Sequence, residues 1–241
     1  MTPYQNVFNR YEQKYLLNRE KYQTLLEYLS AYLTQDQYGR HTIGNIYYDT
    51  PDFALIRNSI EKPVYKEKLR LRSYGVPGTD DFVFLELKKK FARIVNKRRI
   101  QLTLKEAQRY VLQGEKPSSD TQILQEIDWF LKMHRLVPQV FIAYERAAYF
   151  GKEDENLRVT FDQEMRFRAS CLDLSLGDWG RPLLDTDSIL LEIKIPGAIP
   201  LWLNRLLTEM ELFPTPFSKY GVCYKTHLFS QLHPKGGVRC A

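Results

Sequence analysis

Residues 65–90 read YKEKLRLRSYGVPGTDDFVFLELKKK and contain two segments in which apolar and charged side chains alternate. In the first segment the leucines take one parity, and the basic residues take the other: Lys66, Lys68, Arg70 and Arg72. In the second segment Val83, Leu85 and Leu87 are opposed by a charged and aromatic face: Phe82, Phe84, Glu86, Lys88 and Lys90. Alternation with period two is typical of strands whose two faces meet different surroundings. We therefore predict two strands, each with one apolar and one charged face.

The same alternation recurs in residues 157–168 (LRVTFDQEMRFR) and 191–195 (LEIKI). One interpretation is a half-buried antiparallel sheet whose charged face lies in solvent. However, basic residues repeated on neighbouring strands repel one another and require a counter-charge. The second interpretation is a sheet curled into a barrel with its basic face inward, as in barrels that hold a ligand. Such a face would bind a polyanion.

Apolar residues have helical spacing in three further parts of the chain. The first is residues 20–33, and the third is residues 201–212. The second comprises residues 103–112 and 120–136, which are separated by the loop sequence GEKPSSD, with Asp120 as a candidate N-cap. No strand–helix–strand alternation runs through the middle of the chain, which argues against a Rossmann-type parallel sheet. We expect an α+β fold and a single domain over residues 1–241.

Composition is that of an ordinary globular protein: 241 residues, 28.5 kDa, 44% hydrophobic and 27% charged. No run reaches the roughly 18 apolar residues that a bilayer-spanning helix needs, and the sequence MTPYQNVFNR lacks a signal peptide's apolar region. These features predict a soluble, cytoplasmic protein. Cys171, Cys223 and Cys240 have no metal-like spacing, so we expect neither a disulfide framework nor a zinc site.

The net charge of +6, from 35 basic and 29 acidic residues, favours polyanionic partners such as nucleic acid, acidic lipid or phosphorylated metabolites. The sequence contains no GxxxxGK[ST], GxGxxG, HExxH or GxSxG motif. Familiar nucleotide-binding, zinc-protease and serine-hydrolase chemistries are therefore unsupported. No recognised nucleic-acid motif accompanies the basic residues, and we expect no nucleic-acid partner.

Short motifs follow one another in a distinctive order: RYEQK, KLRLRSYG, LELKKK, NKRR, YERAAY, RVTFDQEMRFR, LLEIKIPG and PFSKYG. From about Phe8 to His227, this order resembles the polyphosphate polymerase domain of the vacuolar transporter chaperone (VTC) family, within the triphosphate tunnel metalloenzyme superfamily. The resemblance implies an antiparallel β-barrel tunnel of about eight strands flanked by amphipathic helices. The superfamily motif E-x-E-x-K carries Arg10 in place of its first glutamate, which favours a polymerase-like member.

Residue by residue, the resemblance implies phosphate contacts at Lys14, Arg70, Arg72, Lys88, Lys97, Arg99, Arg146, Arg158 and Lys219. Alternation adds Lys68 and Lys194 to the same faces. Glu192 resembles the glutamate that holds a divalent metal, Mn²⁺ or Mg²⁺, and Glu12 is the second candidate ligand. The implied catalytic residues are Arg70, Arg72, Lys88 and Glu192.

The function implied by the resemblance is metal-dependent phosphoryl transfer, namely synthesis of inorganic polyphosphate from a nucleoside triphosphate such as ATP. A triphosphatase or polyphosphatase and a non-catalytic polyphosphate sensor are the alternatives. A separate membrane protein is a further candidate partner, and the sequence does not determine the oligomeric state. We expect the aromatic residues of IYYDTPDF to pack in the core, and Tyr74, beside the basic strand, is given no role.

Overall fold

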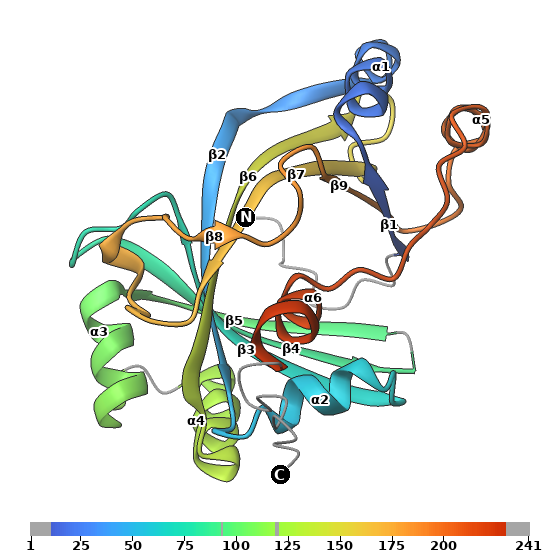
Figure 1. The fold of residues 1–241 in the computed structure, drawn as a ribbon. Coiled ribbons are helices and arrows are strands. Elements are labelled where there is room, and N and C mark those ends of the chain that lie inside the picture. The colour runs from blue at the N-terminus through green and yellow to red at the C-terminus, as the bar shows by residue number, and fades with distance from the viewer. Residues whose placement is uncertain (1–10, 93, 119–120, 230–241) are drawn as a thin grey trace, which may run out of the picture.

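One antiparallel sheet of nine strands runs through the residues that this computed structural model describes, 11–92, 94–118 and 121–229 (Figure 1). The strand order is β1-β9-β7-β6-β2-β3-β4-β5, and β8 pairs with β7. The strands are β1 (Tyr11–Leu17), β2 (Leu33–Asp49), β3 (Tyr65–Tyr74), β4 (Phe82–Phe91), β5 (Ile94–Thr103), β6 (Val137–Gly151), β7 (Arg158–Arg168), β8 (Arg181–Pro182) and β9 (Ile189–Ile195). Three residues from the sequence predictions lie outside the described part: Arg10, Asp120 and Cys240.

The long strands β2 and β6 pair with each other and join two halves of the sheet. In Figure 1 the half made of β1, β7 and β9 lies above, and the half made of β3, β4 and β5 lies below. The α+β class and the antiparallel sheet are confirmed. The closed barrel is wrong, because within the described residues β1 and β5 are edges with no ladder between them. Alternation determines the face that each side chain takes, not whether the first and last strands pair.

Side chains nevertheless approach one another across the open part of the sheet. The carboxylate Oε2 of Glu12 on β1 lies 3.9 Å from Nζ of Lys88 on β4. Lys14 on β1 donates a hydrogen bond to the carbonyl oxygen of Phe217, in the segment that precedes the last described α-helix. We call the face that carries these side chains the inner face.

The α-helices are α1 (Arg19–Leu29), α2 (Ala54–Ile60), α3 (Leu104–Gln108), α4 (Gln122–His134), α5 (Leu201–Glu209) and α6 (Lys219–Cys223). The helix predicted over residues 20–33 ends at Leu29, because a turn follows and Leu33 begins β2. Asn18 caps α1, accepting a 2.8 Å hydrogen bond from the Lys21 amide, and Thr121 caps α4. None of the described helices combines the length and apolar content that crossing a bilayer requires.

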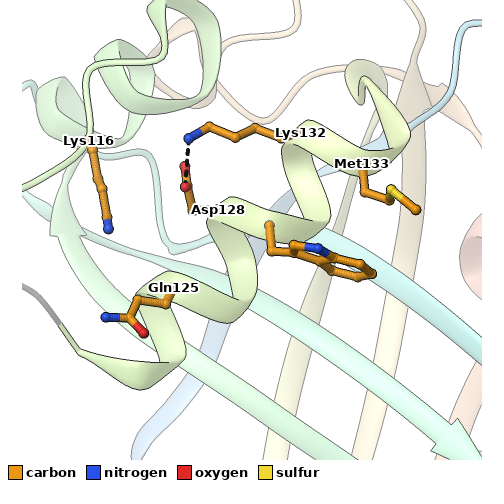
Figure 2. Close-up of a pocket in the computed structure, with 6 residues that line it drawn as sticks. Lys116, Gln125, Asp128, Lys132 and Met133 are labelled. Carbon is orange, nitrogen blue, oxygen red and sulfur yellow. Dashed lines mark hydrogen bonds and ion pairs between the residues drawn. The ribbon is translucent and has the colours of Figure 1, made fainter.

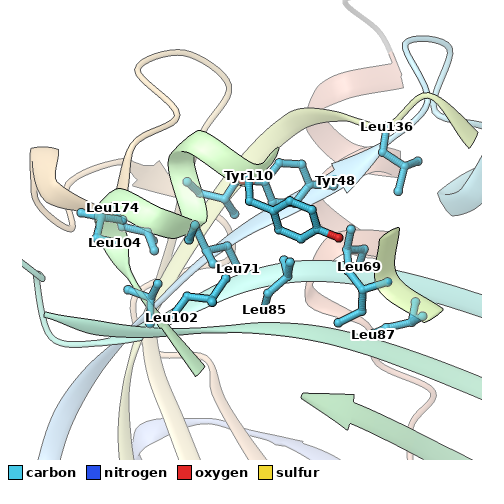
Figure 3. Packing of buried hydrophobic residues seen from close by; sticks show 14 of the residues in the cluster. Tyr48, Leu69, Leu71, Leu85, Leu87, Leu102, Leu104, Tyr110, Leu136 and Leu174 are labelled. Atoms are coloured by element: carbon cyan, nitrogen blue, oxygen red, sulfur yellow. The ribbon is translucent and has the colours of Figure 1, made fainter. Parts of the chain in front are cut away.

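The predicted apolar parities face the helices. Leu69, Leu71, Leu85 and Leu87 are buried in a cluster that Tyr110 and α4 cover (Figure 3). In the other half, the outward side chains of β1, β7 and β9 pack against α1 and α5. Burying each large apolar side chain contributes about 1.5–3 kcal/mol, so helix packing fixes which face of each strand remains for charged residues.

Helix α6 lies between the two halves of the sheet (Figure 1). Its Tyr220 hydroxyl donates a 2.9 Å hydrogen bond to the buried carboxylate of Asp49, which also accepts the amides of Leu55 and Ile56 in the first turn of α2. Tyr47 stacks on Tyr220 with 4.9 Å between ring centroids. The packing role predicted for the IYYDTPDF aromatics is therefore confirmed, and these contacts fix the position of Lys219, the residue before Tyr220.

Candidate anion-binding site

The inner face gathers basic side chains from β1, β3, β4, β5, β6, β9 and α6. The strand residues reach it because alternation places them opposite the leucines and isoleucines that pack against the helices. Ten of the eleven basic residues predicted from the sequence take part in its ion pairs and hydrogen bonds: Lys14, Lys68, Arg70, Arg72, Lys88, Lys97, Arg99, Arg146, Lys194 and Lys219.

Glu86 on β4 is the centre of the first group, the Glu86 cluster. Its side chain is 1% exposed, and its Oε2 accepts from Arg70 Nε at 2.8 Å and Nη2 at 2.7 Å. The remaining cations are Lys97 at 2.5 Å, Arg72 at 3.9 Å and Arg99 at 4.0 Å. Burial disfavours the carboxylate, but these cations outweigh it and hold the pKa of Glu86 far below its usual value.

Glu192 on β9 is the centre of the second group, the Glu192 cluster. Its carboxylate is 7% exposed and lies 3.0 Å from Lys194, 3.2 Å from Lys14, 3.8 Å from Lys219 and 3.9 Å from Arg146. Burial again opposes ionisation, yet the four cations hold the pKa of Glu192 well below its usual value. The same carboxylate, together with Glu12, raises the pKa of Lys14 against the effect of burial.

Two more carboxylates border the Glu192 cluster. Glu12 lies 3.1 Å from Lys14, and the fully buried Asp162 on β7 binds Arg146 through both oxygens at 2.6 and 2.7 Å and also pairs with Lys219. Asp162 was not selected as a site residue from the sequence. Its position in RVTFDQ has the same parity as Arg158, and this shared parity could have placed it on the charged face.

The donor set for a metal ion is small. Within the described residues no group of three or more His, Cys, Asp or Glu side chains is arranged to hold a metal ion. Glu12 and Glu192 both lie within ion-pair distance of the Lys14 ammonium, so the protein offers two carboxylates near one another. Magnesium is held in many sites by one or two carboxylates, with water and phosphate oxygens completing its shell. The two glutamates therefore fit such an ion when a phosphate ligand accompanies it.

A row of lysines crosses three strands and ends at Lys97, which also belongs to the Glu86 cluster. Lys68 on β3 is the direct cross-strand partner of Lys88 on β4, which in turn is the partner of Lys97 on β5. We call these three residues the lysine ladder. Lys68 Nζ donates a 2.9 Å hydrogen bond to Ser218 Oγ, and no carboxylate of the described residues lies within ion-pair distance of it. Like charges directly opposite one another destabilise a sheet, so this arrangement needs an anion.

The pKa values of Lys68 and Lys88 indicate that the positive charge of these two lysines is only partly compensated. Burial, followed by the nearby cations, lowers the pKa of Lys68 to about 7. Burial also lowers the pKa of Lys88 to about 8, with Lys14 and Arg70 acting in the same direction and Glu12 opposing them. An anion bound at the ladder would favour the protonated form of both lysines.

Tyr144 and Asn45 complete the inner face and were not predicted from the sequence. Arg72 donates to Asn45 Oδ1 at 2.9 Å and to the Tyr144 hydroxyl at 3.1 Å, which fixes the plane of its guanidinium. Burial raises the pKa of Tyr144, but Arg72, Arg146 and Lys219 reverse that effect and lower it to about 8. A buried phenol with a lowered pKa indicates strong positive potential.

Arg158 is the predicted residue that stands apart. Its cross-strand partner is Lys194, which places it on the inner face, but its side chain is exposed. Its guanidinium lies 5.7 Å from the centre of the Phe150 ring, and it has no ion pair to any described residue. The structure therefore places Arg158 beside the site and outside both clusters.

A surface cavity of about 410 Å³ lies elsewhere, on the outer side of α4 (Figure 2). Leu124, Ile127 and Phe130 point from α4 into the core, so the cavity occupies the opposite side of this helix. Its lining is Lys116, Gln125, Asp128, Trp129, Lys132 and Met133. The cavity has no part in the inner face.

Comparison with known proteins places these observations in a family. The family model described as the VTC domain matches residues 9–228. A curated relative, vacuolar transporter chaperone complex subunit 4 of Trypanosoma cruzi (strain CL Brener), is 28% identical over 223 residues. That match covers 74% of this chain and 27% of the relative, so the chain spans about a quarter of the relative's length.

Solved structures support the fold. A Bacillus halodurans protein described as a candidate adenylate cyclase has a TM-score of 0.55 and 16% identity, covering 88% of this chain and 94% of its own. A Hippeastrum protein described as a candidate adenylyl cyclase with a dominant triphosphatase activity has a TM-score of 0.53 and 17% identity, covering 89% and 94%. At these identities the likeness shows a common fold.

Proposed function

The chain belongs to the VTC domain family, and from that premise we propose that its inner face binds a nucleoside triphosphate and transfers the γ-phosphoryl group to the end of a growing polyphosphate chain. The bond between the β- and γ-phosphates breaks, and nucleoside diphosphate leaves. The curated relative in the same family is a subunit of the vacuolar transporter chaperone complex. A bound phosphate chain would supply the negative charge that the basic residues of the inner face need.

The observation that carries the proposal is the lysine ladder. Lys68, Lys88 and Lys97 lie opposite one another on three strands, and Lys68 has lost much of its affinity for a proton. A solvated strand face would not lower the pKa of a lysine to about 7. A row of phosphoryl groups supplies regularly spaced negative charge, which matches a row of ammonium groups along neighbouring strands.

Arginines and lysines would bind the phosphates in different ways. Glu86, Asn45 and Tyr144 orient Arg70 and Arg72, so their planar donor groups are fixed before a ligand arrives. Lysines are movable point charges, and Lys14 and Lys194 can turn from Glu192 to a phosphate oxygen. Preorganised donors of this kind stabilise the charge that develops during phosphoryl transfer.

Glu192, with Glu12 beside it, would hold a divalent ion, Mg²⁺ or Mn²⁺, together with phosphate oxygens. When bound, such an ion neutralises charge on the phosphoryl group. Movement of Lys14 and Lys194 away from Glu192 would free its carboxylate for this role. Asp162 keeps Arg146 and Lys219 in place throughout, because both remain bound to it.

The residues of the inner face would promote phosphoryl transfer by positioning the two substrates and by stabilising negative charge. Phosphoryl transfer requires little covalent participation by the protein. The attacking group would be the terminal phosphate of the chain, which is ionised near neutral pH and needs no general base. Arg70, Arg72 and Lys88 would align it with the triphosphate, which makes them, with Glu192, the residues whose loss should affect turnover most.

The direct test is to incubate the purified chain with ATP and Mn²⁺ or Mg²⁺, and to analyse the products by electrophoresis for polyphosphate and by an assay for free phosphate. A metal-dependent ladder of chains is the expected result. Free phosphate without chains would replace the proposal with a triphosphatase, and intact ATP with tight triphosphate binding would replace it with a sensor.

A matched pair of variants tests the role of Glu192. Glu192→Gln should abolish turnover in the presence of metal and leave tripolyphosphate binding intact. The control is Glu126→Gln on α4, which removes a carboxylate that pairs with Lys89 on β4 and Arg98 on β5, and it should leave turnover unchanged. Full activity of Glu192→Gln would mean that this carboxylate is only a structural ion-pair partner.

A further inference from the structure

Four rings lie in sequence at one end of the inner face, and we call them the aromatic rim: Tyr38, His41, Tyr74 and Phe84. Tyr74 packs edge-on against Phe84 with 5.7 Å between centroids. His41 lies 6.0 Å from Tyr74, and Tyr38 lies 6.3 Å from His41. The rim therefore extends from β4 across β3 to β2.

The rim continues directly from the Glu86 cluster. Tyr74 follows Arg72 by two residues on the same face of β3, a step of about 7 Å. Phe84 is the cross-strand partner of Arg72. The Arg99 guanidinium lies 4.4 Å above the Phe84 ring, and its Nη1 is 4.0 Å from Glu86. One arginine thus touches both the rim and the charged cluster.

The rim does not belong to the packed interior. None of its four side chains is a buried member of the three hydrophobic clusters formed by the described residues. Tyr38 is 69% exposed and Tyr74 is 51% exposed, while His41 and Phe84 are partly buried. Exposed rings beside a row of cations match a ligand with a flat aromatic part at one end and phosphates at the other.

We propose that the aromatic rim stacks the base of a nucleoside triphosphate whose phosphates lie on Arg70, Arg72 and the lysine ladder. This inference rests on the proposed function, because it extends the same phosphate site. Stacking on a ring is available to every base, so the rim favours nucleotides over inorganic tripolyphosphate and discriminates weakly among bases. The alternation that places Arg72 on the inner face also places Tyr74 there, so the sequence alone could have identified Tyr74 as a residue of this face.

The test compares ATP with inorganic tripolyphosphate by calorimetry, in EDTA so that neither ligand is turned over. The variants are Tyr74→Ala and the double variant Tyr74→Ala with Phe84→Ala. Loss of stacking should weaken ATP binding roughly 5- to 100-fold, while tripolyphosphate affinity stays within about twofold. Tyr74→Phe should retain ATP affinity, because a phenylalanine ring still stacks.

Tyr28→Ala is the matched control, since Tyr28 is 58% exposed on α1, which packs against the outer side of the sheet. It should change neither affinity. Thermal unfolding of each variant reports whether the fold is intact. Equal losses for ATP and tripolyphosphate would overturn the inference, because the rim would then only support the cations. Unchanged ATP affinity in the double variant would also overturn it and leave the phosphate site standing.

Failure of the phosphate site itself gives a different result. If the wild-type chain binds neither ATP nor tripolyphosphate, the proposed function fails and the inference fails with it. If tripolyphosphate binds and Arg70→Ala weakens it, the phosphate site stands, and the two ATP measurements alone decide the role of the rim.

Discussion

The Glu86 and Glu192 clusters each surround one buried carboxylate with four cations, but their composition is reversed. Glu86 faces three arginines and one lysine, Lys97. Glu192 faces three lysines and one arginine, Arg146. Arginine makes rigid, planar contacts and remains charged, whereas lysine is a movable point charge. Equal charge counts therefore produce one fixed cluster and one that can rearrange.

The clusters also differ in what remains when the central carboxylate is removed. Within the described residues, the Glu86 cations pair with no other carboxylate. In contrast, Lys14 also pairs with Glu12, and Arg146 and Lys219 also pair with Asp162. We infer that Glu86 chiefly stabilises the fold and orients arginines, and that Glu192 is the carboxylate available to a ligand.

The largest expected effect is the loss of stability in Glu86→Gln. Removing one partner from a buried ion pair leaves uncompensated charge and costs about 3–5 kcal/mol in the free energy of unfolding. Glu192→Gln should cost less than half of that, because three of its four cations keep a second carboxylate, Glu12 or Asp162. Urea unfolding of both variants measures the difference. Equal losses, or a larger loss for Glu192→Gln, would contradict the division between a fixed and a rearranging cluster.

The next effect concerns binding by the fixed arginines. Arg70→Ala combined with Arg72→Ala should weaken tripolyphosphate binding roughly 100-fold, because hydrogen bonds to charged groups contribute about 1.5–3 kcal/mol each. The domain should remain folded, since Glu86 keeps Lys97 and Arg99. Calorimetry gives the affinity, and circular dichroism gives the folded state. An unchanged affinity would mean that this strand presents only a solvated charged face.

A smaller effect is the pH dependence that Lys68 confers. Its pKa of about 7 in the free protein would rise when an anion binds. Its ammonium therefore strengthens binding fully below pH 7, and this contribution is lost as the pH rises through the raised pKa of the complex. The affinity ratio of wild type to Lys68→Met should fall from roughly tenfold at pH 6 toward one at pH 10.

Taking a ratio removes the titration of tripolyphosphate itself, because both proteins meet the same ligand. Arg40→Met serves as the control, since Arg40 pairs with Glu164 on the surface and is not a member of the lysine ladder. A ratio for Lys68→Met that does not change with pH would show that the lysine ladder carries ordinary, solvated ammonium groups.

Alternation in the sequence predicts which face of each strand is charged, but it does not predict how the ends of the sheet are arranged. Period two determined the inner and outer faces of β3, β4, β7 and β9, because a leucine row that packs under helices fixes the opposite row. It therefore brought Arg70, Glu86 and Glu192 onto one face correctly. Closure of the sheet was mispredicted, since pairing between edges depends on the twist and length of distant strands.

Helix α6 and the residue pairs around it could not be predicted from patterns in the sequence. The five residues of α6 are too few to show helical periodicity, and the helix is held by the Tyr220–Asp49 hydrogen bond across 171 positions of sequence. The bidentate pair of Arg146 with Asp162 likewise depends on the register of β6 against β7. Register between strands is set by tertiary packing, which short motifs do not encode.

The smallest expected effect belongs to Arg158, and it measures where the site ends. Its exposed guanidinium shares the inner face with Lys194 but belongs to neither cluster. Exposed charges contribute about 0–1 kcal/mol and are screened by salt. Arg158→Ala should therefore weaken tripolyphosphate binding by less than about fivefold at low salt, and the loss should disappear in 0.5 M NaCl. A salt-resistant loss as large as that of the Arg70 and Arg72 variant would place Arg158 inside the site, and the rearranging cluster would then extend beyond Glu192 to the first residue of β7.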